Sequence, residues 1–259
     1  MQHVGIIGID AATKARNMGL AYGEVRDGRC ELFEVEQGRD PVGQIARWID
    51  AGPKTILLAV DAPLGWPDEL GVALASHQAG MPLGVPLDQS HRLFRRHADT
   101  IIKRCIGKQP LDVGANFIAR TAHAILWRLH ELPDRCTRTI DLQMAWDPDL
   151  RPGCHMIEVY PAATLIGLAA ELKGYKAKGA AVGPIRENIL EALGEVIQIH
   201  TPMEPMITND DLLDSALCVL AGFDFLSGLA MAPSTNEMAI AQKEGWIWCR
   251  GTRTDLEDP

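Results

Sequence analysis

Residues 56–67 read ILLAVDAPLGWP, and this stretch decides how the rest of the sequence is interpreted. Its apolar run predicts a buried strand over residues 55–61 that ends on Asp61. Pro63 then turns the chain away, because proline cannot continue a central strand. A buried strand that ends on a carboxylate raises the question of what this carboxylate does.

The same pattern occurs twice more along the chain. Residues 4–10, VGIIGID, predict a strand that is buried on both faces and ends on Asp10. Residues 154–161, CHMIEVYP, predict a third strand, which carries Glu158 close to its end. Because the carboxyl ends of parallel strands meet at one edge of an α/β sheet, we expect these acids to converge with Asp61.

A fourth acidic segment, DDLLDSAL at residues 210–217, begins the longest predicted helix. Asp211 and Asp214 are three residues apart and share a helix face, which can point at the sheet edge. Crowded carboxylates repel one another, so their pKa values rise unless a cation compensates the charge. Mg²⁺ and Mn²⁺ prefer carboxylate oxygens, and two such ions can clamp the attacking and leaving oxygens of a phosphodiester.

Each acid alone has a simpler interpretation as a turn residue or as a cap that the helix dipole favours. The three strand-end acids and the acidic helix start together favour a metal site instead. We predict that five residues are both catalytic and metal-binding: Asp10, Asp61, Glu158, Asp211 and Asp214. The pattern leaves open which of the two helix residues, Asp211 or Asp214, binds the metal.

The composition excludes several classes of protein. With 47% hydrophobic residues in a chain of 259, a sizeable core is expected and disorder is not. The net charge of −9 argues against a general nucleic-acid coat, which needs a basic surface. The six cysteines form no C-x-x-C pair, which argues against zinc-knuckle and thioredoxin-like sites. No signal peptide or bilayer-length apolar run is recognisable, so we expect a cytoplasmic protein without membrane contact.

The remaining patterns predict an α/β fold with one domain over residues 1–259 and an insertion at roughly residues 62–150, after the Asp61 strand. Residues 62–112 carry no clear periodicity. A hairpin that turns at Asp27-Gly28 and a final hairpin that turns at Glu244-Gly245 are predicted. The predicted hairpins and helices cover residues 18–38 and 238–249 (hairpins), and 41–52, 112–132, 162–172, 184–196 and 210–229 (helices).

Six motifs in order make the sequence resemble a known family. They are GIDAA at 8–12, VDAPLG at 60–65, RRHAD at 95–99, EVYPAA at 158–163, DDLLDSAL at 210–217 and EGWIW at 244–248. The chain resembles domain-of-unknown-function family 429, whose members are regarded as predicted nucleases of the ribonuclease H-like fold. The resemblance implies a mixed central sheet flanked by helices. It also implies that the strand of Asp10 lies at the centre, beside the strand of Asp61, with the hairpin strands on its other side.

The resemblance also implies roles for individual residues. Asp10 matches the first-strand acid of ribonuclease H-like enzymes, and Asp61 matches the acid on the adjacent strand. Asp211 or Asp214 matches the acid of the late helix, and Glu158 is the glutamate of the E-x-x-P pattern of the family.

Basic residues near these acids are candidates for substrate binding. Residues 91–108 carry six arginines and lysines against one acid, and Arg95 and Arg96 within them can contact phosphates. A solvated helix face explains the same pattern equally well. Lys176 and Arg186 are further candidates for substrate binding, although an exposed loop is a simpler interpretation of their surroundings.

The leading functional hypothesis is a nuclease, or another phosphodiester hydrolase, that depends on Mg²⁺ or Mn²⁺ and has nucleic acid as its partner. One alternative is an ATP-dependent phosphotransferase of the related actin-like fold. A single set of motifs in 259 residues argues against it, because such chains duplicate the fold. The other alternative is a scaffold without catalytic activity. The sequence does not determine whether the substrate is DNA or RNA, nor the oligomeric state.

Overall fold

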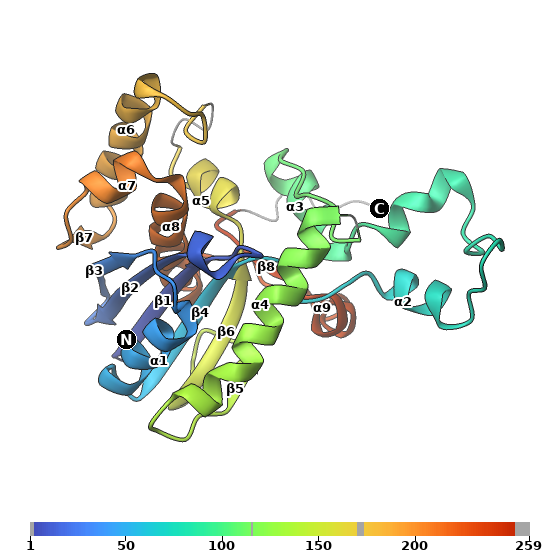
Figure 1. Ribbon diagram of the computed structural model, residues 1–259, viewed down its shortest axis with the longest axis horizontal. Helices are drawn as coiled ribbons and strands as arrows, with labels where there is room; N and C mark the ends of the chain where they lie inside the picture. Colours follow the sequence, from blue (N-terminus) through green and yellow to red (C-terminus); the bar gives the residue numbers. More distant parts are fainter. Residues whose placement is uncertain (1–2, 115, 170–173, 252–259) are drawn as a thin grey trace.

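The structure is a computed structural model that describes residues 3–251 except 115 and 170–173 (Figure 1). An eight-stranded sheet has the order β5-β6-β4-β1-β2-β3-β7, and β8 also pairs with β6. The strands are β1 (Val4–Asp10), β2 (Gly19–Arg26), β3 (Arg29–Glu36), β4 (Thr55–Asp61), β5 (Leu142–Met144), β6 (Gly153–Val159), β7 (Gln198–Ile199) and β8 (Ile247–Trp248).

Strand β1 lies at the centre of this sheet. It pairs in parallel with β4 on one side and antiparallel with β2 on the other, and β2 turns into β3 at Asp27-Gly28. Both turn residues have positive φ angles, as a tight turn that follows the twist of the strands requires. The sheet therefore confirms the mixed α/β fold and the strand arrangement that the family resemblance implies.

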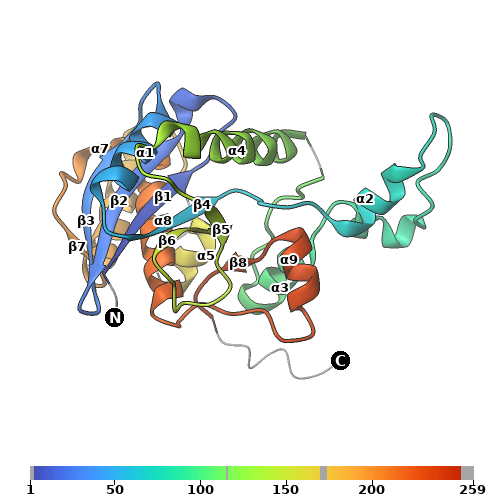
Figure 2. The ribbon, with the colours of Figure 1, turned by 90° about the horizontal axis from the view of Figure 1, so that it is seen from below.

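Helices cover both faces of the sheet (Figures 1 and 2). On one face, α1 and α4 pack over a core that includes Trp48 and Ile125. On the other face, α8 lies along β1 and β2 over a second core that includes Leu217 and Phe225, next to α5. The helices are α1 (Pro41–Ala51), α2 (Asp68–Ala75), α3 (His97–Ile106), α4 (Asn116–Arg135), α5 (Pro161–Gly167), α6 (Gly183–Gly194), α7 (Glu204–Thr208), α8 (Asp210–Leu226) and α9 (Met238–Glu244), with 3₁₀ turns η1 (Ala15–Asn17), η2 (Leu87–Leu93) and η3 (Ala180–Val182).

The chain between β4 and β6 covers the residues where the sequence predicts an insertion after Asp61, and we refer to it as the insertion. It contributes α2, η2, α3, α4 and the edge strand β5. Helix α2 stands away from the sheet, whereas α4 returns across it next to α1 and α3 packs beside α9 (Figures 1 and 2). None of the described helices combines the length and the apolar character that a membrane span requires.

Three local predictions were wrong. The helix predicted at residues 162–172 ends at Gly167, and residues 170–172 lie outside the described residues. Residues 238–244 form helix α9 rather than a hairpin strand, since alanine, glutamine, lysine and glutamate favour a helix despite the alternation. Gly245, with a φ of +92°, ends that helix before β8. Helix α4 also continues through Pro133 instead of stopping before it. Leu129 and Leu132 are buried in the core that α1 shares, and this packing outweighs the backbone hydrogen bond that proline removes.

Candidate metal centre

Three aspartates come together at the carboxyl edge of the central strands. Asp10 ends β1, Asp61 ends β4, and Asp214 lies in the first turns of α8. One carboxylate oxygen from each lies within 4.8 Å of the others, and we call this group the acidic triad. The structure therefore brings together three of the five residues that the sequence analysis selects.

Register explains the first two members of the triad. Strands β1 and β4 run in parallel with Asp10 directly opposite Asp61, so the two side chains leave the same face of the sheet. Both strands are fully buried up to these residues, which fixes their ends rigidly. The pair is thus a direct consequence of two apolar strands that stop at the same level.

Two glycines in the sheet allow α8 to approach closely enough to place Asp214, the third member of the triad, beside the strand ends. A Cβ added at Gly8 would lie 2.0 Å from the Ser215 carbonyl oxygen, and one added at Gly19 would lie 1.9 Å from that of Asp211. The backbone of α8 therefore rests directly on β1 and β2, closer than any side chain would allow. This close approach brings Asp214 to the strand ends, and glycines on the sheet were the sequence signal that could have indicated it.

Burial and mutual repulsion set the electrostatics of the triad. Burial, followed by the charges of Asp61 and Asp214, raises the pKa of Asp10 well above its ordinary value. Burial, followed by the charge of Asp214, raises the pKa of Asp61 to about 7. Burial also raises the pKa of Asp214, although Lys176 acts in the opposite direction. A cation bound here would relieve this repulsion.

One cation of the chain already lies against the triad. The Lys176 Nζ is 2.5 Å from Oδ2 of Asp214, and the Tyr175 hydroxyl donates to Oδ1 at 3.0 Å. Two consecutive residues, Tyr175 and Lys176, therefore bind the two carboxylate oxygens of Asp214. Burial lowers the pKa of Lys176, but Asp214, Tyr175 and Asp61 together more than offset this and keep it above its ordinary value. One lysine balances at most one of the three carboxylates.

The other two predicted acids lie outside the triad. Asp211 accepts a hydrogen bond from Gln37 Nε2 at 2.8 Å and only adds a smaller repulsion to Asp10. Glu158 stands opposite Val60, one residue short of Asp61, so its side chain starts on the other face of the sheet. Its two oxygens accept from the guanidinium of Arg96 at 2.7 and 2.6 Å.

The predicted substrate-binding residues are mostly engaged within the protein. Arg96 is 1% exposed and bonds to Asp99 as well as to Glu158. Arg186 is also buried and donates to the carbonyl oxygens of Tyr175 and Ile207 and to the Asp210 carboxylate. Arg95 forms an exposed ion pair with Asp112, and Lys176 lies at the triad. We therefore leave Arg96 and Arg186 out of the proposed substrate contacts, and Glu158 out of the proposed metal ligands.

A cavity of about 560 Å³ contains two members of the triad, Asp10 and Asp61. Glu158 and Arg96, paired with each other, line the same cavity. Its other walls come from the turn after β4, the chain between α3 and α4, the first turns of α4, the start of α5, and the segment of Tyr175 and Lys176. Lys108 and Thr121 line this cavity, and the sequence analysis did not select them as site residues. The cavity joins segments that are distant in the sequence, so no local pattern could reveal its lining.

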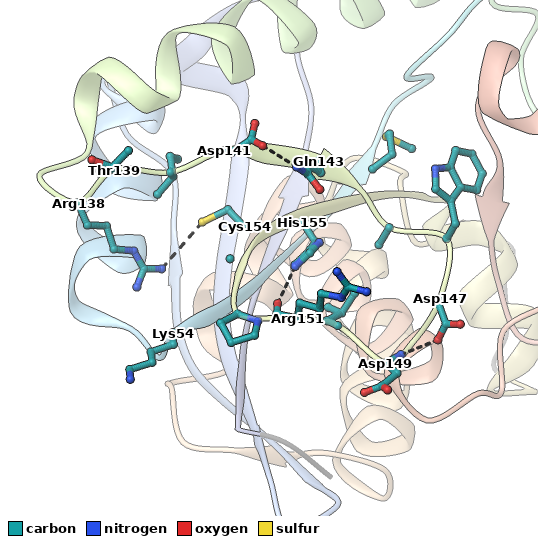
Figure 3. A pocket seen from close by; sticks show the side chains of 17 residues that line it. Lys54, Arg138, Thr139, Asp141, Gln143, Asp147, Asp149, Arg151, Cys154 and His155 are labelled. Atoms are coloured by element: carbon teal, nitrogen blue, oxygen red, sulfur yellow. Dashed lines mark hydrogen bonds between the residues drawn. The ribbon is translucent and has the colours of Figure 1, made fainter.

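A second hollow, of about 780 Å³, lies at the opposite ends of β4 and β6 (Figure 3). Arg138 reaches across it toward Cys154, with a nitrogen 3.9 Å from the sulfur, and also donates to the carbonyl oxygen of Pro53. Three basic and three acidic side chains mix along its lining: Lys54, Arg138, Arg151, Asp141, Asp147 and Asp149. It contains no member of the triad, and we assign it no part in the candidate centre.

Comparison with known proteins identifies the family to which this chain belongs. The family model described as "Protein of unknown function (DUF429)" matches residues 8–238. The chain belongs to this family. Among solved structures, this DUF429 protein is similar to T. thermophilus RuvC in complex with Holliday junction substrate, with 13% sequence identity and a TM-score of 0.35 over 87% of this chain and 96% of that chain. No curated protein sequence matches it.

The chemistry of the donors fits a divalent cation. Asp10, Asp61 and Asp214 offer only carboxylate oxygens, the ligands that Mg²⁺ and Mn²⁺ prefer, and include neither a thiolate nor an imidazole. Burial raises the pKa values of all three acids, and neighbouring carboxylates raise those of Asp10 and Asp61 further, so a bound cation would favour their ionised forms. These three residues are the ones that would hold such an ion.

Proposed function

We propose that this protein is a divalent-metal-dependent phosphodiester hydrolase that acts on nucleic acid. The convergence of Asp10, Asp61 and Asp214 at the buried strand ends, within 4.8 Å of one another, carries this proposal. When bound there, Mg²⁺ or Mn²⁺ would supply positive charge to the phosphate oxygens and favour attack by water.

The residues of the chain have distinct parts in this function. Asp10 and Asp61 hold fixed positions because their strands are buried up to the last residue. Tyr175 and Lys176 hold the Asp214 carboxylate in one orientation. Lys176 also carries a positive charge beside the acids. Once a bound metal ion balances the charge of Asp214, the Lys176 ammonium group can bind a phosphate oxygen. A preorganised site of this kind needs little reorganisation during the reaction.

An activity assay with a matched pair of variants tests the proposal. The substrates are single-stranded and duplex DNA and RNA, in linear and circular forms, with Mg²⁺, with Mn²⁺, or with a chelator. Asp61→Asn keeps the size of the side chain but removes its charge, and we expect a rate loss of about 10²-fold or more, equivalent to about 3 kcal/mol. Asp27→Asn, in the exposed β2–β3 turn, is the control and should retain the full rate.

Two results would contradict the proposal. One is full activity of Asp61→Asn, which would place the chemistry elsewhere. The other is the absence of cleavage of every substrate with both ions, which would favour a scaffold without catalytic activity or a phosphotransferase.

A further inference from the structure

The cavity over the triad has the size and walls of a small-molecule site. Its volume of about 560 Å³ lies within the range of roughly 300–1,000 Å³ that ligand pockets occupy. The insertion supplies one wall of it, through the chain that leads from α3 into α4. Asp10 and Asp61 are therefore reached through a space bounded by protein on several sides rather than from a flat surface.

The wall from the insertion has an apolar part and a charged part. Pro110, Leu111 and Ile118 contribute the apolar part. Lys108 follows Gly107, which ends α3 in the left-handed conformation, and its exposed side chain lines the cavity. Within the described part of the chain, Lys108 makes no ion pair, whereas Lys176 is bound to Asp214 and Arg96 to Glu158. Lys108 is thus free to contact an anion that enters.

This combination matches one nucleotide. A nucleotide presents a flat aromatic base whose faces can stack on apolar surfaces, a polar sugar and an anionic phosphate within a few bonds of one another. Bases that are stacked and paired in a duplex cannot enter a bounded pocket unless they are flipped out, which costs a few kcal/mol. Unpaired bases avoid most of this cost, and apolar or aromatic surfaces bind them without regard to sequence.

We propose that the cavity binds one unpaired nucleotide, with its base against Leu111 and Ile118 and a phosphate between the triad and Lys108. This proposal rests on the proposed function and specifies its substrate as single-stranded nucleic acid or an unpaired strand end. A free nucleotide has the same recognisable chemistry, so the experiment distinguishes the two sources.

Equilibrium binding tests this inference separately from catalysis. The probes are a labelled single-stranded oligonucleotide and a blunt hairpin duplex of the same length, both with cleavage-resistant phosphorothioate linkages, and a nucleoside 5′-monophosphate. Direct binding of the oligonucleotides and competition by the monophosphate are measured by fluorescence anisotropy with Mn²⁺ present. We expect the single strand to bind at least about tenfold more tightly than the duplex. Tighter binding of the monophosphate than of the single strand would support the cavity and identify free nucleotides as the source.

Two pairs of variants locate the binding. Ile118→Trp fills the cavity and should weaken single-strand binding about tenfold, whereas Phe117→Trp, exposed on the same helix, should not. Lys108→Ala removes an exposed side chain that packing does not need. The slope of log K against log salt is negative, and Lys108→Ala should make it less steep by about 0.7. This is the change expected when a single strand loses one phosphate contact. Arg104→Ala, exposed on α3 and outside the cavity lining, is its control.

The failures of the two proposals can be told apart. Equal binding of duplex and single strand, or unchanged binding in both Ile118→Trp and Lys108→Ala, would overturn the single-nucleotide inference. Cleavage that Asp61→Asn abolishes would then still support the hydrolase. Selective single-strand binding that Ile118→Trp weakens, without cleavage of any substrate, would support the cavity and overturn the hydrolase.

Discussion

Asp10 and Asp61 lie directly opposite each other at the last paired position of the parallel strands β1 and β4. Asp214 approaches the same point from α8, so three carboxylates share one small volume. The fold therefore holds like charges together that would separate in an unfolded chain. This arrangement costs stability wherever the three groups are ionised, and several measurements can detect that cost.

The first prediction concerns pH. Asp61 has an ordinary pKa of 3.8 and a folded-state pKa of about 7, so the folded protein retains a proton that the unfolded chain loses. Its contribution to stability is fully present below about pH 4 and is lost as the pH rises through about 7. We expect the melting temperature of the metal-free protein to fall across this window. Asp61→Asn should reduce the fall, and Asp27→Asn should not.

Metal should reverse this trend. If Mn²⁺ binds at Asp10, Asp61 and Asp214, protons compete with it, so the rise in melting temperature with millimolar Mn²⁺ should be larger at pH 8 than at pH 5.5. Melting curves at both values, with and without the ion, measure it. A rise that is equal at the two pH values, or absent at both, would argue against metal binding at the triad.

The second prediction separates two neighbouring arginines. Arg96 is buried with Asp99 and Glu158, so Arg96→Ala leaves carboxylates uncompensated in the core and should cost about 3–5 kcal/mol of unfolding free energy. Arg95→Ala breaks only the exposed pair with Asp112 and should cost at most about 1 kcal/mol. Urea unfolding of both variants checks this, and similar losses in the two would contradict it.

The third prediction concerns the contact between α8 and β1. Gly8→Ala places a methyl group against the Ser215 carbonyl oxygen, so α8 must move away, at a cost of about 1–3 kcal/mol. The shift also moves Asp214 from Asp10, so Mn²⁺ should stabilise this variant less than the wild type. Gly71→Ala, in α2 with open space around it, is the control and should be neutral or stabilising by up to about 1 kcal/mol. An unchanged Mn²⁺ response in Gly8→Ala would show that the close approach is not needed for the site.

The sequence predicts the strands of Asp10 and Asp61 well, because their apolar runs and stops are local patterns. It could not predict the position of Glu158, which depends on the register of β6 against β4 and on the distant Arg96. The choice between Asp211 and Asp214 likewise depends on how deeply α8 rests on the sheet. The structure places Asp214 in the triad for that tertiary reason.

The chain between α3 and α4 shows a second limit. Lys108 lies in the basic segment that the sequence analysis singled out, but charge alone does not distinguish it from Arg95 or Arg96. Both Arg96 and Lys108 line the cavity, but only the folded chain shows that Arg96 is buried and paired with Glu158 while Lys108 is exposed. Long-range pairing of charges therefore decides which cations are free for a substrate.

The last prediction concerns Lys176, whose ammonium group occupies the place beside Asp214 that a metal ion would share. Lys176→Gln removes the positive charge of the chain nearest to the triad, so the metal-free protein at pH 8 should lose about 1–3 kcal/mol of unfolding free energy. The same change removes a competitor for Asp214, so the increase in melting temperature with Mn²⁺ should be larger than in the wild type. Lys178→Gln, two residues further on and exposed, controls for the loss of one charge. If Lys176→Gln responds to Mn²⁺ no more strongly than the wild type and Lys178→Gln, then Lys176 does not compete with the ion, and its contact with Asp214 only orients the carboxylate.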